Sequence, residues 1–105
     1  MTDSISIQHL AQLLKKKNKV VVLDVRRKDD YEQSPQRIVG SDWRDPALID
    51  DWIGSVPQDE DIVVYCVKGG PVSQSVAGQL EARACRVKFL EGGIKAWREN
   101  GGATE

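Results

Sequence analysis

One of the two cysteines, Cys66, stands where a nucleophile can form. It directly follows the β-branched run Ile62–Tyr65 and precedes a short loop that contains Gly69 and Gly70. Glycines can adopt positive φ, so the backbone amides of such a loop can point inward together and bind an anion. A helix that we expect to begin with Ser73 as its N-cap adds the positive end of a helix dipole. The loop therefore predicts an ionised, nucleophilic thiolate at Cys66.

The residues around Cys66 decide which thiolate chemistry fits. Acyl transfer needs a histidine base, and the one histidine, His9, falls in a predicted N-terminal helix. A cysteine phosphatase loop places an arginine six positions after the cysteine to bind phosphoryl oxygens, but Val72 occupies that position here. Thiol–disulfide exchange and persulfide formation need only an accessible thiolate and amide donors. Chemistry in which sulfur is the electrophile therefore remains.

The elements that must position Cys66 alternate between strands and helices. Apolar runs predict strands at 20–25, 62–65 and 87–90. Helix signals predict four helices. The first runs from Ser6 to about Lys16, the second from Asp45 and Pro46 to a stop at Gly54, and the last over 94–100. The third begins at Ser73, and its apolar side carries Val76, Ala77, Leu80 and Ala84. Residues 26–42 are charged and irregular, with one helical turn near 29–32.

This alternation predicts an α/β fold with parallel strands, right-handed crossovers and helices on both faces of the sheet. Ligands bind such sheets outside the carboxyl ends of the strands, and Cys66 lies at one such end. The fold therefore strengthens the interpretation of Cys66 as a site residue.

Size and charge narrow the function classes. The 105 residues predict a single domain, 1–105, and 40% apolar residues are enough for a core without disulfides. Fifteen basic and sixteen acidic residues give a net charge of −1, which argues against a nucleic-acid partner. No apolar run is long enough to span a membrane, and Met1 to Gln8 lack the pattern of a secretory signal. We therefore expect a cytoplasmic protein with no membrane partner and reduced thiols.

Metal binding is not expected either. Two cysteines and one distant histidine fall short of the ligands that a structural zinc site needs.

Three segments carry a resemblance to a known family. They are Asp24-Val25-Arg26 with Asp30-Tyr31, Tyr65-Cys66 with its loop, and Leu90-Glu91-Gly92-Gly93-Ile94-Lys95-Ala96-Trp97. Together they resemble the rhodanese superfamily, in its single-domain sulfurtransferase branch, over roughly 6–102. The resemblance implies an open, mainly parallel five-stranded sheet with helices on both faces. It also implies an active-site cysteine that accepts a sulfane sulfur as a persulfide and passes it on, without a metal or organic cofactor.

Carried onto this sequence, the resemblance assigns roles to individual residues. Cys66 would attack the outer sulfur of a small anionic donor such as thiosulfate, and a thiol or cyanide would accept the sulfur. Lys68, the cation of the loop, could neutralise the donor or remain solvated, and Arg44 could line the same mouth. The persulfide would be held by the amides of Val67, Lys68, Gly69, Gly70, Val72 and Ser73.

Two features leave alternatives open. The loop is one residue longer than the family's Cys-x-x-Gly-x-Arg-Ser and has Val72 before Ser73, so it could admit a larger oxyanion and leaves thiosulfate specificity unsettled. The alternative function is a non-catalytic persulfide carrier or thiol-sensing module that takes sulfur from a partner protein.

Other polar candidates have structural interpretations. Cys85 could act as a resolving thiol for Cys66, but its predicted place between a helix and a strand favours a small packed residue. Asp24 and Arg26 are expected to order the following loop rather than touch a substrate.

Overall fold

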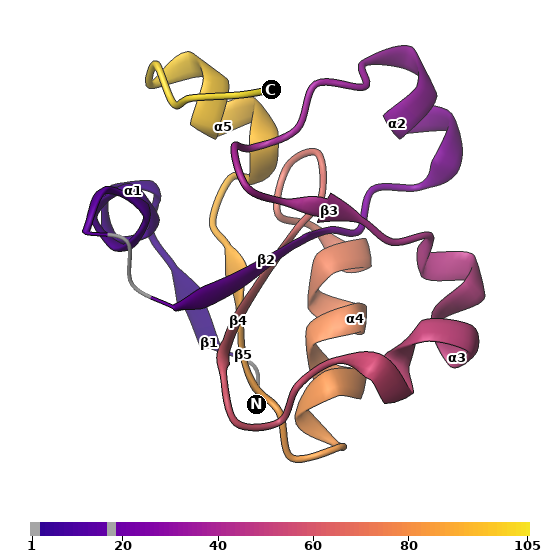
Figure 1. Cartoon of the computed structure of the whole chain (residues 1–105). Helices are drawn as coiled ribbons and strands as arrows, with labels where there is room; N and C mark the ends of the chain where they lie inside the picture. Colours follow the sequence, from indigo (N-terminus) through magenta and orange to yellow (C-terminus); the bar gives the residue numbers. More distant parts are fainter. Residues whose placement is uncertain (1–2, 17–18) are drawn as a thin grey trace.

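A five-stranded sheet forms the centre of the computed structural model, which describes residues 3–16 and 19–105 (Figure 1). Its strand order is β1-β5-β4-β2-β3, and every pairing is parallel. The strands are β1 (Asp3–Ile5), β2 (Val20–Asp24), β3 (Asp42–Trp43), β4 (Asp61–Tyr65) and β5 (Arg86–Leu90). The α/β fold is therefore confirmed, and β1 and β3 are the two strands that apolar runs did not predict.

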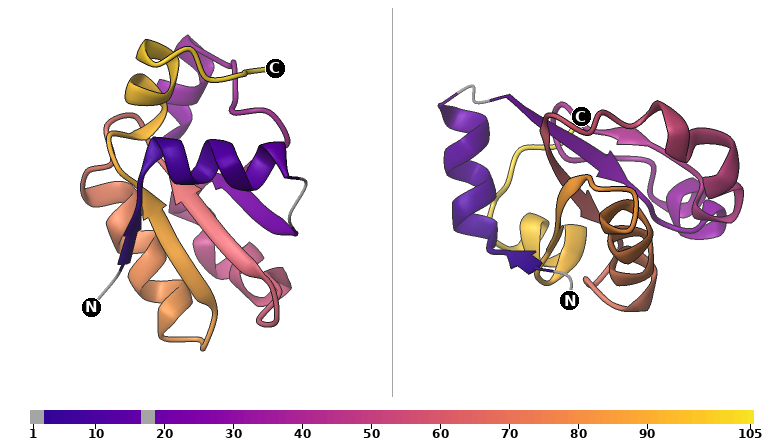
Figure 2. Two further views of the ribbon diagram at one scale, coloured as in Figure 1. Left: turned by 90° about the vertical axis from the view of Figure 1, so that its left-hand side faces the viewer. Right: turned by 90° about the horizontal axis from the view of Figure 1, so that it is seen from below.

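Helices cover both faces of the sheet, as expected. The helices α1 (Ile7–Lys15) and α5 (Gly93–Glu99) pack on one face, whereas α3 (Ile49–Trp52) and α4 (Pro71–Glu81) pack on the other (Figures 1 and 2). The short helix α2 (Lys28–Gln33) lies in the connection from β2 to β3.

Alternate residues of the central strands supply the two cores. Val22 and Val63 belong to the cluster beneath α1 and α5, and their neighbours Leu23 and Val64 belong to the cluster beneath α3 and α4. Successive side chains of a strand point to opposite faces, so both must be apolar when both faces are covered. This requirement explains the unbroken apolar runs of β2 and β4.

Two predicted N-caps are present. The Ser6 hydroxyl accepts a hydrogen bond from the His9 amide at 3.1 Å, and a carboxylate oxygen of Asp45 accepts one from the Ala47 amide at 2.9 Å. Each side chain satisfies an amide that the first helical turn leaves without a partner.

The helix predicted from Asp45 and Pro46 is present, but it is not one regular α-helix. Two 3₁₀ turns, Pro46–Leu48 and Ile53–Ser55, flank α3, so the helical segment does not stop at Gly54. The Asp45 carbonyl accepts hydrogen bonds from the Leu48 amide at 3.0 Å and from the Trp52 indole at 2.8 Å. A bond to the third residue tightens the first turn into 3₁₀ geometry.

The start of α4 also differs from the prediction. Gly70, not Ser73, is the N-cap, and Pro71 takes the first helical position. Proline suits that position because its fixed φ is helical and no acceptor is needed there. Ser73 lies inside the first turn and is fully buried.

The end of α4 differs from the expectation that Ala84 lies on the apolar side of this helix. The helix ends at Glu81, and Ala84 is an exposed residue with φ of 64°. The Cys85 amide donates to the Leu80 carbonyl and the Ala84 amide to the Glu81 carbonyl, at 3.1 and 3.0 Å. These two bonds form a Schellman turn, whose left-handed position glycine usually occupies.

Within residues 3–16 and 19–105, no helix is long and apolar enough to cross a membrane. The same residues contain no group of three or more His, Cys, Asp or Glu side chains placed to hold a metal ion.

Candidate active site

Cys66 lies directly after β4, the middle strand, at the carboxyl end of the sheet. Its side chain is largely buried, with 6% of the residue exposed, and its thiol donates a hydrogen bond to the Ser73 hydroxyl at 3.2 Å. It nevertheless lines a cavity of about 380 Å³ together with Arg26, Arg27, Asp30, Val67, Lys68, Gly70, Pro71 and Val72. A small reagent can therefore approach the sulfur from this cavity.

The backbone amides predicted to hold an anion are available as donors. Within the described part of the chain, none of them donates a hydrogen bond to a protein group; they belong to Val67, Lys68, Gly69, Gly70, Val72 and Ser73. The last two lie in the first turn of α4, where amides have no acceptor one turn earlier. The segment thus presents a row of unpaired donors beside the thiol.

The Gly92-Gly93 turn packs against this loop at the start of α5. The Ile94 and Lys95 amides at the start of α5 donate to the Cys66 and Val67 carbonyls, both at 3.0 Å. In a trans peptide the N–H points opposite to the C=O, so these bonds turn the amides of Val67 and Lys68 away from α5. Anchoring of the carbonyls leaves the amides free to bind an anion.

The anchoring requires glycine on both sides of the contact. Gly93 has φ of 61°, and a Cβ there would lie 2.5 Å from the Val67 carbonyl oxygen. Gly69 has φ of 72°, and a Cβ there would lie 2.8 Å from the Gly92 nitrogen. Both glycines therefore allow the loop and the turn to approach more closely than side chains would permit.

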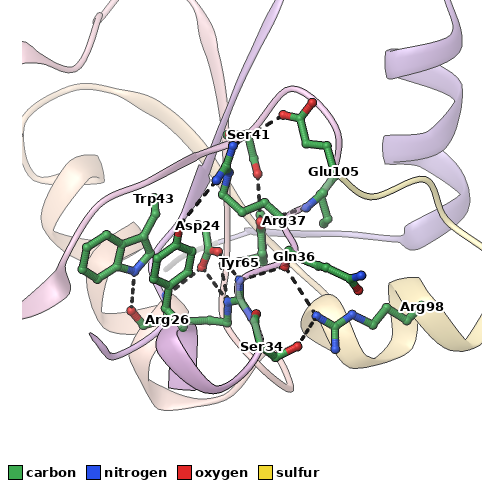
Figure 3. A network of polar contacts seen from close by, with 12 residues as sticks. Asp24, Arg26, Ser34, Gln36, Arg37, Ser41, Trp43, Tyr65, Arg98 and Glu105 are labelled. Carbon is green, nitrogen blue, oxygen red and sulfur yellow. Dashed lines mark hydrogen bonds and ion pairs between the residues drawn. The ribbon is translucent and has the colours of Figure 1, made fainter. Parts of the chain in front are cut away.

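Asp24 and Arg26 form a buried ion pair that orders the neighbouring segment, as expected (Figure 3). The Arg26 guanidinium donates to both carboxylate oxygens of Asp24, with a shortest contact of 2.6 Å. It also donates to the Ser34 and Gln36 carbonyls at 2.8 and 3.0 Å. Arg26 is 2% exposed, and this set of partners satisfies a charge that burial would otherwise make costly.

An aromatic pair fixes α2 above the same end of the sheet. The rings of Tyr31 and Trp43 stack with centroids 4.6 Å apart, and the Trp43 indole donates to the Arg26 carbonyl at 2.9 Å. The Arg37 guanidinium donates to the Tyr31 hydroxyl at 3.4 Å, which raises the pKa of Arg37 above its ordinary value. These contacts hold the segment that begins at Arg27 next to the Cys66 cavity.

The cations predicted for the site are not all at the cavity. Lys68 lines it, but Arg44 is not among the lining residues. The Arg44 amide donates to the Asp24 carbonyl at 2.8 Å, and its guanidinium donates to the Trp43 carbonyl at 3.2 Å. A contact between Arg44 and a substrate remains a prediction.

Arg27 is the cation that sequence reasoning missed. It is exposed, lines the Cys66 cavity and also lines a neighbouring hollow of about 660 Å³. The available signal was its place directly after Asp24-Val25-Arg26, because residues that follow a strand end face the ligand side of a parallel sheet.

Cys85 lies at the amino end of the strands, opposite to the carboxyl end at which Cys66 lies. It directly precedes β5, whose first residue Arg86 pairs with Asp61, and Cys66 comes five residues after Asp61. Since Cys85 comes one residue before Arg86, six residue steps of about 3.3 Å separate the two cysteines by about 20 Å along the strands, well beyond the roughly 7 Å between Cα atoms that a disulfide tolerates. Cys85 packs in the core beneath α4, which agrees with its structural interpretation.

The sheet is parallel, and a cysteine with a loop of unpaired backbone amides follows its middle strand. These features define a site of the rhodanese-like class. The chain belongs to the rhodanese-like domain family, whose model matches residues 6–100. The resemblance seen in the sequence is thereby confirmed.

Individual relatives agree with this assignment. A protein named sulfurtransferase from Allochromatium vinosum is 29% identical over 102 residues, which cover 96% of this chain and 92% of the relative. A rhodanese-related protein from Thermoplasma volcanium has the same fold, with 23% identity, a TM-score of 0.84 and coverage of 98% of this chain and 97% of that structure. A structure from Rhodopseudomonas palustris, described as a possible tyrosine phosphatase, is 28% identical with a TM-score of 0.83 and coverage of 99% and 85%.

Proposed function

We propose that this protein is a sulfurtransferase that carries a sulfane sulfur as a persulfide on Cys66. The observation that carries the proposal is the placement of Cys66 in a cavity beside a row of unpaired amides. Membership of the rhodanese-like family and the similarity to the Allochromatium sulfurtransferase support it.

In the first half-reaction, the Cys66 thiolate attacks the outer sulfur of thiosulfate. A bond forms between Sγ and that sulfur, the bond to the sulfonate group breaks, and its electron pair leaves with sulfite. The new persulfide is an anion at the position where the loop amides and the start of α4 concentrate positive potential. Those dipoles are fixed before the reaction, so they stabilise the charge without reorganisation.

In the second half-reaction, a thiolate or cyanide attacks the outer sulfur of the persulfide. The bond between the two sulfurs breaks and its electron pair returns to Cys66 as thiolate. Neither half-reaction needs a separate proton-transfer base, which is consistent with a cavity lined by cations, one carboxylate and apolar groups but no histidine.

Cys66→Ser tests the mechanism. The wild-type protein should gain the mass of one sulfur atom when incubated with thiosulfate and should form thiocyanate when cyanide is added. The variant should do neither, and Cys85→Ser serves as the matched cysteine control. Equal rates of thiocyanate formation in the wild type and Cys66→Ser would refute the proposal.

A persulfide carrier served by a partner protein is the second candidate. The hollow of about 660 Å³ beside the cavity favours it, because this space exceeds what thiosulfate or cyanide fills. Intact-mass measurement after incubation with a cysteine desulfurase and cysteine separates the candidates. Loading from the desulfurase alone supports the carrier, and loading from neither source refutes both.

Phosphate-ester hydrolysis is less well supported. The position at which a phosphatase loop carries its arginine holds Val72, whose side chain has no hydrogen-bond donor or charge for a phosphoryl oxygen.

A further inference from the structure

Three cationic side chains line the Cys66 cavity, but they are not equally free to bind an anion. Arg26 is buried, and its guanidinium is committed to Asp24 and two backbone carbonyls. Arg27 and Lys68 are exposed, and within residues 3–16 and 19–105 neither side chain makes a hydrogen bond or ion pair. Asp30 is the one carboxylate among the lining residues.

Neighbouring contacts hold the backbone that carries Arg27 in place. Its carbonyl accepts a hydrogen bond from the Tyr31 amide at 2.9 Å, and the Tyr31 ring stacks on Trp43. Arg26, the preceding residue, is fixed by its buried ion pair. The backbone that carries Arg27 is therefore ordered from both sides. Lys68 follows the Val67 carbonyl, which the Lys95 amide anchors at 3.0 Å, so the two cations differ in their donor groups: only the guanidinium of Arg27 presents a planar pair of donors.

We propose that Arg27 binds the anionic group of the sulfur donor and supplies the cation that Val72 does not. The inference deepens the proposed function and rests on it. A guanidinium can donate two parallel hydrogen bonds to a sulfonate, as it does to carboxylates and phosphates. The same contact also stabilises the negative charge that develops on the sulfonate as it departs as sulfite, because the electron pair of the broken bond moves onto that group.

Two alkylating reagents test the position of Arg27 without any sulfur transfer. Iodoacetate and iodoacetamide react with the same thiolate and lose the same iodide, but only iodoacetate is an anion. The ratio of their rates at Cys66, measured by peptide mass, therefore reports positive charge in the cavity. For a charge assumed to lie about 6 Å from the carboxylate of the reagent, Coulomb's law with the dielectric constant of water predicts about a threefold fall in this ratio when that charge is removed.

The chain offers a matched control one residue along. Lys28 carries the same charge but lines only the outer hollow and pairs with Glu32 at 3.9 Å. Arg27→Gln should lower the iodoacetate-to-iodoacetamide ratio about threefold, and Lys28→Gln should leave it nearly unchanged. Asp30→Asn should raise it. Equal falls in both cation variants, or a wild-type Cys66 that reacts with neither reagent, would overturn the proposal.

Steady-state kinetics then connects the charge to the donor. Because the two half-reactions are separate, the KM for thiosulfate and the KM for cyanide can be measured independently. Loss of a charge-assisted contact should raise the KM for thiosulfate about tenfold in Arg27→Gln and less in Arg27→Lys, with little change in the KM for cyanide.

The two assays distinguish the possible failures. Sulfur transfer from thiosulfate with an unchanged KM in Arg27→Gln refutes the role of Arg27 and leaves the proposed function standing. A charge effect on alkylation in a protein that takes no sulfur from thiosulfate refutes the proposed function, while the anion contact of Arg27 stands.

Discussion

Gly93 links the stability of the fold to the position of the reactive sulfur, so Gly93→Ala should damage both. The residue has φ of 61°, and an added Cβ would lie 2.5 Å from the Val67 carbonyl oxygen, with the Cys66 carbonyl oxygen also in contact. Left-handed backbone costs a non-glycine residue about 1 kcal/mol. The clash must also separate the loop from α5 and weaken the two hydrogen bonds from the Ile94 and Lys95 amides, at a net cost of about 1 kcal/mol each. We expect a loss of about 3 kcal/mol in the free energy of unfolding.

Gly101→Ala is the control that separates the backbone strain at positive φ from the steric clash of the added Cβ. Gly101 has φ of 75°, but a Cβ there would meet nothing within 4 Å, so only the backbone cost of about 1 kcal/mol applies. Urea unfolding of the two variants, followed by tryptophan fluorescence, should therefore differ by about 2 kcal/mol. The alkylation rate of Cys66 should change in Gly93→Ala and not in Gly101→Ala. Equal losses of stability with an unchanged Cys66 rate would show that the turn does not hold the loop.

Three further substitutions probe separate parts of the structure. Ala84→Gly should stabilise the protein by about 1 kcal/mol in urea unfolding, because glycine removes left-handed strain at an exposed position; a loss of stability would contradict the assigned turn. Burial raises the pKa of Tyr65 well above its ordinary value, so this group's contribution to stability is complete below about pH 10 and is lost as the pH rises further. Tyr65→Phe should abolish this alkaline loss, and should also lower stability near neutral pH by about 1–3 kcal/mol because the Ile38 amide and Ser41 hydroxyl lose their partner. Thermal melts from pH 7 to 11 measure both effects, and an unchanged loss of stability at alkaline pH in the variant would show that Tyr65 is not its cause. Cys85→Ser should leave the rate of thiocyanate formation unchanged, since Cys85 lies about 20 Å from Cys66 along the strands, and a large fall would show that a resolving thiol is needed.

Local sequence predicts those parts of the fold whose cause is local. The runs at β2 and β4 reveal strands because both faces of the sheet demand apolar residues. Ser6 and Asp45 reveal helix starts because each side chain accepts a hydrogen bond from an amide two or three residues later. The place of Cys66 predicts a site residue because the end of a parallel strand is where such folds bind ligands.

The sequence could not predict elements that depend on distant partners. The strands β1 and β3 have three and two residues, and they exist because β5 and β2 offer them a pairing edge. Serine is a residue type favoured at N-caps, but Gly70 and Pro71 begin the helix before Ser73. The Ser73 hydroxyl instead accepts a hydrogen bond from the Cys66 thiol. Ala84 continues the apolar spacing of α4, yet the turn into β5 places it beyond the helix.

The cations at the site also depend on distant partners: Arg27 lines the Cys66 cavity, whereas the predicted Arg44 does not. Both lie beyond the carboxyl end of a strand, Arg27 after β2 and Arg44 after β3, so sequence spacing alone does not show which of them is nearer to Cys66. The ranking comes from which strand neighbours β4: β2 pairs with β4 directly, whereas β3 lies one strand further out. Since Cys66 follows β4, the segment after β2 reaches its cavity first. A cation that meets a substrate at Cys66 is therefore selected by sheet order, which only long-range pairing determines.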